Sequence, residues 1–308
     1  MIETKTAEAG QTGRCERDPV PVVSIGLPVF NGEKYLREAL DSLLAQTFRD
    51  FELMISDNAS TDATQAICEE YAAQDKRISY VRQPNWLSAY DNFYYCLERA
   101  RGKFFMWSAV DDHHPPNYVE VLAGCLNSNP QAVLAFGKVR IVKHNCTLAD
   151  AADIPFAFAT AGRRAWIALT ITSQINCYHI YGLWRPEALR SIPYGLYGRC
   201  TWGADLAMLM SASVLGEFLS CPETAFVYRE TKKTSKERVK YQDGREKPRR
   251  VHAMLNLLRA TFLSVGKTGG ALMGGYAVVL TLIKHVRLLP GFIRNRMDEL
   301  VTLRSSRQ

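Results

Sequence analysis

Through its first half the chain alternates apolar runs of strand length with amphipathic segments of helix length. The apolar runs are rich in β-branched residues, and the segments between them place apolar side chains every three or four positions. We expect strands at residues 22–30, 51–56, 78–81, 103–110 and 132–142, with helices at 33–46, after Ser60 or Thr61, at 88–99 and after Pro115-Pro116. This alternation predicts an α/β fold with a mostly parallel central sheet flanked by helices.

Three polar loops follow strands of this predicted sheet. They are Asn31-Gly32 after the first strand, residues 57–62 after the second and residues 111–114 after the fourth, and the last two are rich in carboxylates. Ligands of open α/β sheets bind beyond the carboxyl ends of the strands, so we expect the functional site at these loops.

Asp111 and Asp112 are adjacent acids at the end of an apolar strand. Placing two like charges together is costly unless a cation or hydrogen bonds compensate. Mn²⁺ or Mg²⁺ bound between these carboxylates and a diphosphate would relieve the repulsion, and His113 or His114 could add a ligand. The alternative is a solvated acidic turn before the helix that starts near Pro115.

Asp57 also follows a buried strand and can accept a hydrogen bond from a base or a ribose. Its alternative role is to cap the next helix. Ser60, Thr61 and Asp62 are better placed for capping, so we expect Asp57 to be spare for a ligand.

We expect the chain to consist of three parts. Residues 1–18 are polar and predict a disordered tail without a signal peptide, residues 19–230 form the α/β domain, and residues 231–308 form a basic and helical C-terminal region. We therefore expect a cytoplasmic protein.

The net charge of +7 is concentrated, because residues 229–250 hold ten Lys or Arg against four Asp or Glu. No groove-reading motif accompanies this charge, so we expect no nucleic-acid partner. Residues 268–283 carry no charge but number only 16, short of the roughly 20 that a membrane-spanning helix needs. The C-terminal region either attaches peripherally to the inner face of an anionic membrane or packs as helices on the main domain.

The segments SIGLPVFNG at 24–32, SDNASTD at 56–62 and WSAVDD at 107–112 resemble, in order and spacing, those of glycosyltransferase family 2. The resemblance extends over residues 22–230. It implies the GT-A fold and inverting transfer of a sugar from a UDP- or dTDP-sugar to a glycan or glycolipid acceptor, as in cell-surface polysaccharide synthesis.

The resemblance also implies roles for individual residues. A nucleotide pocket is implied for Pro28, Phe30, Asn31, Asp57, Arg82 and Asp111. Asp57 would hold the uracil or thymine ring, Asp112 would bind the metal of a DxD-type motif, and Asp111 would face the ribose or the sugar. Val110 replaces the leading acid of that motif, which makes Asp112 the better-supported ligand.

Asp205, in the segment WGAD, resembles the family's catalytic base, since displacement at the anomeric carbon needs a carboxylate to accept the proton of the acceptor hydroxyl. An ordinary acid at a helix N-terminus is the alternative. The segment that contains Arg229, Lys232 and Lys233 resembles a family loop that covers the diphosphate. The alternative is that these residues are an ordinary solvated run of charges.

Tyr181 and Trp184 fall where family members contact the acceptor, although both are equally plausible core residues. The atypical Val110-Asp111-Asp112 segment also leaves open a second function, a non-catalytic module that has kept the nucleotide pocket.

Overall fold

The structure is a computed structural model that describes residues 19–143, 146–153, 177–193 and 204–230, with short pieces between 258 and 278 (258–259, 261–263, 265–267, 274–275 and 278). In chain order the elements are β1 (Val23–Val29), α1 (Leu36–Leu44), β2 (Phe51–Asp57), α2 (Thr64–Gln74), β3 (Ile78–Arg82), α3 (Ala89–Arg99), β4 (Phe104–Trp107), α4 (Tyr118–Ser128), β5 (Ala132–Val142), η1 (Leu148–Asp150), β6 (Ala152–Asp153), η2 (Cys177–Tyr181), β7 (Leu183–Trp184), α6 (Pro186–Ser191), α7 (Ala204–Ser213) and β8 (Glu217–Arg229).

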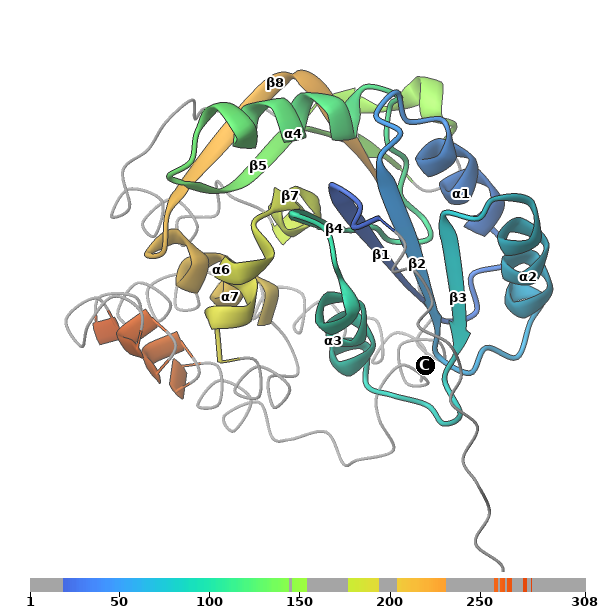
Figure 1. Ribbon diagram of the computed structural model, residues 1–308, viewed down its shortest axis with the longest axis horizontal. Coiled ribbons are helices and arrows are strands. Elements are labelled where there is room, and N and C mark those ends of the chain that lie inside the picture. Colours follow the sequence, from blue (N-terminus) through green and yellow to red (C-terminus); the bar gives the residue numbers. More distant parts are fainter. Residues whose placement is uncertain are drawn as a thin grey trace, which may run out of the picture.

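The strands form one mixed, mostly parallel sheet in the order β3-β2-β1-β4-β7-β5-β6, with β8 paired to β5 (Figure 1). β3, β2, β1 and β4 run parallel to one another, and β8 runs parallel to β5. The short strand β7 lies antiparallel to both of its neighbours. The prediction of an α/β fold with a mostly parallel sheet is therefore confirmed.

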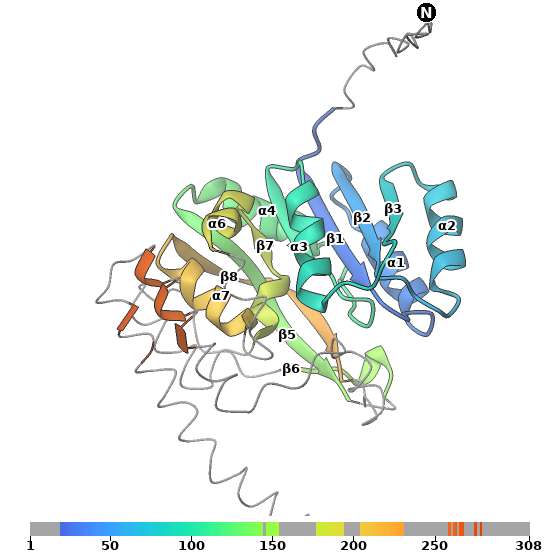
Figure 2. The same cartoon turned by 90° about the horizontal axis from the view of Figure 1, so that it is seen from below.

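Each face of the sheet is covered by helices and has its own core. One core contains side chains of α1, α2 and α4, and the other contains side chains of α3, α6 and α7. Figure 2 shows α3, α6 and α7 on the same side of the sheet. β4 supplies both cores alternately, because Phe104 and Met106 face one and Phe105 and Trp107 face the other. Two buried faces explain why this strand is wholly apolar.

The sequence did not predict β7, which separates β4 from β5. Trp184 pairs with Phe105 on one side and with Leu134 on the other. Its side chain is fully buried, and its indole N–H donates to the carbonyl of Ile180 at 2.8 Å. Trp184 is therefore a core residue, and a surface on which an acceptor sugar stacks cannot include its ring.

Most predicted strands and helices agree with the structure within a few residues. The sequence also predicts a strand at residues 224–229, and the observed strand β8 is longer because it begins at Glu217. The first helix begins at Leu36, later than the predicted start at residue 33. α2 begins at Thr64, later than a cap at Ser60 or Thr61 would place it. The predicted tail at 1–18 and the basic stretch at 231–250 lie outside the described residues.

The described pieces of the C-terminal region are helical. Val265 is fully buried in the same core as α6 and α7, and the side chain of Thr261 is buried too. These residues therefore pack on the main domain, as one of the two alternatives predicted. No helix among the residues that the structure describes is long and apolar enough to cross a membrane.

His114 is a buried polar residue in the core between α4 and β8. Its ring lies 5.0 Å from the ring of Tyr118 and 5.4 Å from that of Phe226, measured between centroids. Neither ring nitrogen has a hydrogen-bond partner among the described residues. Burial, with a smaller contribution from His113, lowers the pKa of His114 to about 3, so the ring is neutral in the folded protein.

Trp184→Ala should lower the free energy of unfolding by about 3–5 kcal/mol, because it leaves a large cavity at the centre of the sheet. Urea denaturation measures this. Trp86→Ala is the control, since Trp86 is only partly buried, and we expect it to cost about 1 kcal/mol or less. Equal losses in the two variants would contradict the central position of Trp184.

His114 should make the fold sensitive to acid. Its pKa is lower in the folded than in the unfolded chain, so its contribution to stability is complete above the unfolded value near 6.5 and is lost as the pH falls toward 3. When the pH falls from about 7 to about 5, the protonation of His114 in the unfolded chain should lower the free energy of unfolding of the wild type by about 2 kcal/mol. His114→Leu should remove that part of the loss in urea titrations, and an unchanged pH dependence would contradict the assignment.

Candidate active site

The carboxyl ends of β1, β2 and β3 meet at one edge of the sheet. Val29 of β1 is in register with Asp57 of β2, and Asp57 is in register with Arg82 of β3. The loops that follow β1 and β2 therefore start side by side, as the parallel sheet requires. This places Asn31 and Asp57 at the same edge, where the sequence predicted a site.

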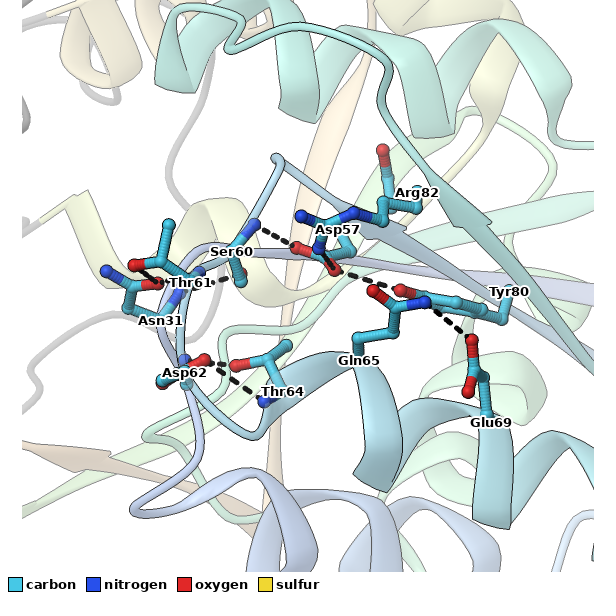
Figure 3. A network of polar contacts seen from close by, with 12 residues as sticks. Asn31, Asp57, Ser60, Thr61, Asp62, Thr64, Gln65, Glu69, Tyr80 and Arg82 are labelled. Carbon is cyan, nitrogen blue, oxygen red and sulfur yellow. Dashed lines mark hydrogen bonds and ion pairs between the residues drawn. The ribbon is translucent and has the colours of Figure 1, made fainter.

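Asn31 joins the loop after β1 to the loop after β2. Its side-chain oxygen accepts from the backbone N–H of Thr61 at 2.8 Å, and its own N–H donates to the hydroxyl of Ser60 at 2.9 Å (Figure 3). Asn31 has a φ of 50°, a left-handed conformation that asparagine tolerates better than most residues. The side-chain type and the backbone shape thus both suit asparagine here.

A second, reciprocal pair of contacts joins the same two loops. The N–H of Glu33 donates to the carboxylate of Asp62 at 3.1 Å, and the N–H of Ala63 donates to the carboxylate of Glu33 at 2.9 Å. Asp62 also accepts from the N–H of Thr64, the first residue of α2, at 3.0 Å. Of the three predicted capping candidates, Asp62 is therefore the one whose side chain bonds to the backbone at the start of α2.

Asp57 is fully buried, and both of its carboxylate oxygens have partners. Oδ1 accepts from the N–H of Ser60 at 2.9 Å, whereas Oδ2 accepts from the hydroxyl of Tyr80 at 2.9 Å and from the Arg82 guanidinium at 3.0 Å (Figure 3). The expectation that Asp57 is spare was wrong, because a buried carboxylate must be compensated by such donors.

Of the other residues predicted to bind the nucleotide, Pro28 is buried within β1, Phe30 is partly buried and Asn31 is exposed. Arg82 is the exposed member of its ion pair, with 36% of its side-chain surface accessible. The structure thus places Asn31, Asp57 and Arg82 together, with Phe30 next to Asn31 in the chain.

The second acidic loop lies against the end of β8. His113 and Val227 exchange two backbone hydrogen bonds, both of 3.0 Å, and the N–H of Arg229 donates to Oδ1 of Asp112 at 3.4 Å. Asp112 is almost completely buried, whereas Asp111 is partly exposed. The chain from β8 is therefore held directly beside the acidic pair.

Whereas the backbone of Arg229 contacts Asp112, its guanidinium contacts α1 and the residue before it. It donates to the carboxylate of Glu38 and lies over the ring of Tyr35, with 4.8 Å between the guanidinium carbon and the ring centroid. Arg229 thus lies between α1 and the acidic loop. Lys232 and Lys233, which were predicted to act with it, lie outside the described residues.

Three acids act on the phenol of Tyr181, which is partly buried in η2. Burial raises its pKa well above the ordinary value, and the carboxylates of Asp112, Asp111 and Asp205 raise it further. Asp205 lies in the first turn of α7 and is partly exposed. The structure therefore brings Asp205 into the electrostatic neighbourhood of the acidic pair, although 93 residues of sequence separate Asp205 from Asp112.

The sequence did not predict that two tyrosines, Tyr178 and Tyr228, pair beside the acidic loop. The rings of Tyr178 and Tyr228 are 4.4 Å apart between centroids. Burial, Tyr178 and the carboxylates of Asp111 and Asp112 raise the pKa of Tyr228 to about 12. The two rings are only partly buried, so they form an aromatic surface beside the acidic pair. Tyr228 directly precedes Arg229, which was the available signal.

The acidic loop could supply some, but not all, of the ligands of a hard divalent cation. The described residues contain no group of three or more His, Cys, Asp or Glu side chains that could enclose a metal. Mg²⁺ and Mn²⁺ sites that act on nucleotides commonly use one or two carboxylates and take their other ligands from phosphates and water. Asp111 and Asp112 fit such a shared site, and they do not fit a site made by protein ligands alone.

Comparisons with known proteins show which family this chain resembles. The family model described as "Glycosyl transferase family 2" matches residues 24–185, more than half of the chain. Curated relatives include the glycosyltransferase GlyA of Streptococcus pneumoniae, 38% identical over 32% of this chain and 14% of its own length. The putative glycosyltransferase EpsH of Bacillus subtilis is 40% identical over 32% of this chain and 29% of its own length. The matched segments are thus less than a third of these relatives.

Solved structures resemble the whole domain. TarS 1-349 of S. aureus in complex with UDP-GlcNAc has a TM-score of 0.65 at 16% identity, and the match covers 85% of this chain and 72% of that TarS fragment. GalNAc-T7 with UDP, GalNAc and Mn²⁺ has a TM-score of 0.53 at 11% identity, covering 70% and 45% of the two chains. At such identity the likeness concerns the fold, and it confirms the GT-A fold. With the family match over residues 24–185, the chain belongs to glycosyltransferase family 2.

Proposed function

We propose that the protein is an inverting, metal-assisted transferase that moves a sugar from a UDP- or dTDP-sugar to a hydroxyl of a glycan or glycolipid. One observation carries this proposal. The strand-end edge of this family 2 domain has a buried carboxylate, Asp57, at the end of β2 and an acidic pair, Asp111 and Asp112, after β4, with Asp205 near the pair.

In this proposal the nucleotide lies along the edge formed by β1, β2 and β3. Asp57 accepts the imide N–H of uracil or thymine, and Arg82 lies beside the nucleotide, as its exposed guanidinium allows. Pro28, Phe30 and Asn31 line the pocket from the β1 side. The structurally similar TarS was solved in complex with UDP-GlcNAc, which supports a uridine nucleotide as the donor here.

The diphosphate and the sugar would then lie at the acidic loop. Asp112 would hold Mn²⁺ or Mg²⁺, with Asp111 toward the ribose or sugar, and the bound cation would neutralise negative charge on the diphosphate. The structurally similar GalNAc-T7 was solved with UDP and Mn²⁺, which supports this choice of metal. Arg229, with Lys232 and Lys233 after it, would add positive charge where the leaving group departs.

Asp205 is the proposed general base. Its carboxylate would accept the proton of the acceptor hydroxyl while the acceptor oxygen attacks the anomeric carbon opposite the departing diphosphate, which inverts the configuration. The electrostatic neighbourhood that Asp205 shares with Asp111 and Asp112 around Tyr181 supports this role. An acid that only stabilised the N-terminus of α7 would not need to lie there.

The acceptor would bind on the side of η2 and β8. Tyr181 remains a candidate acceptor contact because its side chain is only partly buried, and the Tyr178–Tyr228 pair adds two further rings. Aromatic faces suit the apolar C–H patches of sugar rings. A lipid-linked acceptor would agree with peripheral attachment of the basic stretch at 231–250 to the cytoplasmic face of a membrane, which forms part of the proposal.

A donor screen tests the proposal. UDP- and dTDP-sugars are incubated with a mixed glycan and lipid-linked acceptor panel, with and without Mn²⁺, and released UDP or TDP is measured. We expect release with one donor class, dependent on Mn²⁺ or Mg²⁺. Asp112→Asn and Asp205→Asn should each lower turnover by at least about 100-fold, since each removes a group that acts in the transition state.

The two variants should differ in binding. Asp205→Asn should retain UDP affinity within about twofold, because the base acts only on the acceptor, whereas Asp112→Asn should weaken metal-dependent UDP binding. Full turnover in both variants would contradict the site. UDP binding without turnover of any donor would favour the second candidate function, a non-catalytic nucleotide-binding module, which the Val110 substitution motivates.

A further inference from the structure

The Asp57 carboxylate has little acceptor capacity left. An ionised carboxylate offers about four acceptor positions. Three are filled by the N–H of Ser60, the hydroxyl of Tyr80 and the guanidinium of Arg82 (Figure 3). A ligand that binds Asp57 must therefore use the remaining position or replace one of these donors.

The three donors differ in how easily they can be replaced. Ser60 is held in place because its hydroxyl accepts a hydrogen bond from the backbone N–H of Asn31. Its own backbone N–H, which donates to Asp57, is therefore fixed in position. Tyr80 is anchored in β3 and is partly buried. Arg82 is the most exposed of the three, and it covers a carboxylate that has no accessible surface of its own. A ligand arriving from solvent thus meets Arg82 first, and Arg82 is the exchangeable partner.

The sheet explains why Tyr80 reaches the same oxygen as Arg82. Side chains two residues apart on a strand lie on the same face, so Tyr80 and Arg82 both project from one face of β3. On the adjacent strand β2, Asp57 lies opposite Arg82, and Ile55, two residues before Asp57, lies opposite Tyr80. Tyr80 is therefore diagonal to Asp57 on the same face of the sheet. Burial and the Asp57 carboxylate raise the pKa of Tyr80 well above its ordinary value, so the phenol keeps its proton and remains a donor.

We propose that Tyr80 is a positioning residue for nucleobase recognition. With Ser60 it holds the Asp57 carboxylate in one orientation while Arg82 gives way, so that the carboxylate presents an acceptor to the imide N–H of a uracil or thymine ring. Cytosine has an acceptor at the same ring position and would face the carboxylate lone pairs directly. The inference rests on the proposed role of Asp57 and adds the group that makes this role selective.

Tyr80→Phe tests this inference, because it removes one oxygen atom and preserves the ring. UDP and CDP binding are measured by calorimetry on the full-length protein. We expect UDP to bind about tenfold more weakly, because the carboxylate loses a fixed donor, while CDP affinity changes by less than about twofold. The preference for UDP over CDP should therefore fall by about the same tenfold factor.

Tyr71→Phe is the matched control. The Tyr71 hydroxyl also donates to an aspartate, Asp41, at 2.7 Å, but this contact lies on the outer surface between α2 and α1. The control should leave both affinities and their ratio unchanged. A thermal melt of each variant confirms that it is folded under the conditions of the titration.

Two results would overturn the inference. One is an unchanged UDP affinity in Tyr80→Phe, and the other is an equal loss of UDP and CDP affinity, which would mean that Tyr80 only supports the fold. Asp57→Asn separates these results from a failure of the proposed function. Weakened UDP binding in Asp57→Asn with normal binding in Tyr80→Phe refutes the role of Tyr80 alone, whereas normal UDP binding in both variants refutes the role of Asp57 as well.

Discussion

The hydrogen bonds that join the loop after β1 to the loop after β2 determine where the rest of the site lies. Asn31 is hydrogen-bonded to Ser60 and Thr61. The carboxylates of Glu33 and Asp62 each accept from a backbone N–H of the opposite loop. These contacts join the segments that lead into α1 and α2, two of the helices that cover this side of the sheet. They also fix the Ser60 N–H, which orients the Asp57 carboxylate. A pocket that recognises a flat base needs such a rigid frame, because recognition through a carboxylate depends on its orientation.

A second set of contacts brings the far end of the domain to the same edge. The two backbone hydrogen bonds between His113 and Val227 attach β8 to the acidic loop, and Arg229 extends from there to Glu38 of α1. The acidic pair is therefore enclosed by segments from both ends of the domain. Residues that are distant in sequence, such as Asp205 and Tyr228, can act at the same place for this reason. The proposed roles follow from this arrangement: Asp57 binds the base, Asp112 holds the metal, and Asp205 accepts the proton.

The sequence predicted the architecture because strand and helix periodicity are local properties, and the ligand edge followed from the parallel sheet. It failed where long-range packing decides. β7 has only two residues, so no periodicity reveals it, and the burial of Trp184 follows from its insertion between β4 and β5. Asp57 looked spare because its partners Tyr80 and Arg82 come from another strand. The contact between Glu38 and Arg229 spans 191 positions and leaves no local trace.

A crystal structure of the protein with UDP and Mn²⁺ tests the central claim most directly, namely that one nucleotide spans the two acidic loops. We expect the uracil ring against Asp57, with its imide N–H on the carboxylate and Arg82 displaced from it. We also expect the diphosphate and the metal at Asp112, beside the end of β8. A nucleotide bound with its base at Asp112, or bound elsewhere on the domain with both loops unchanged, would contradict this claim.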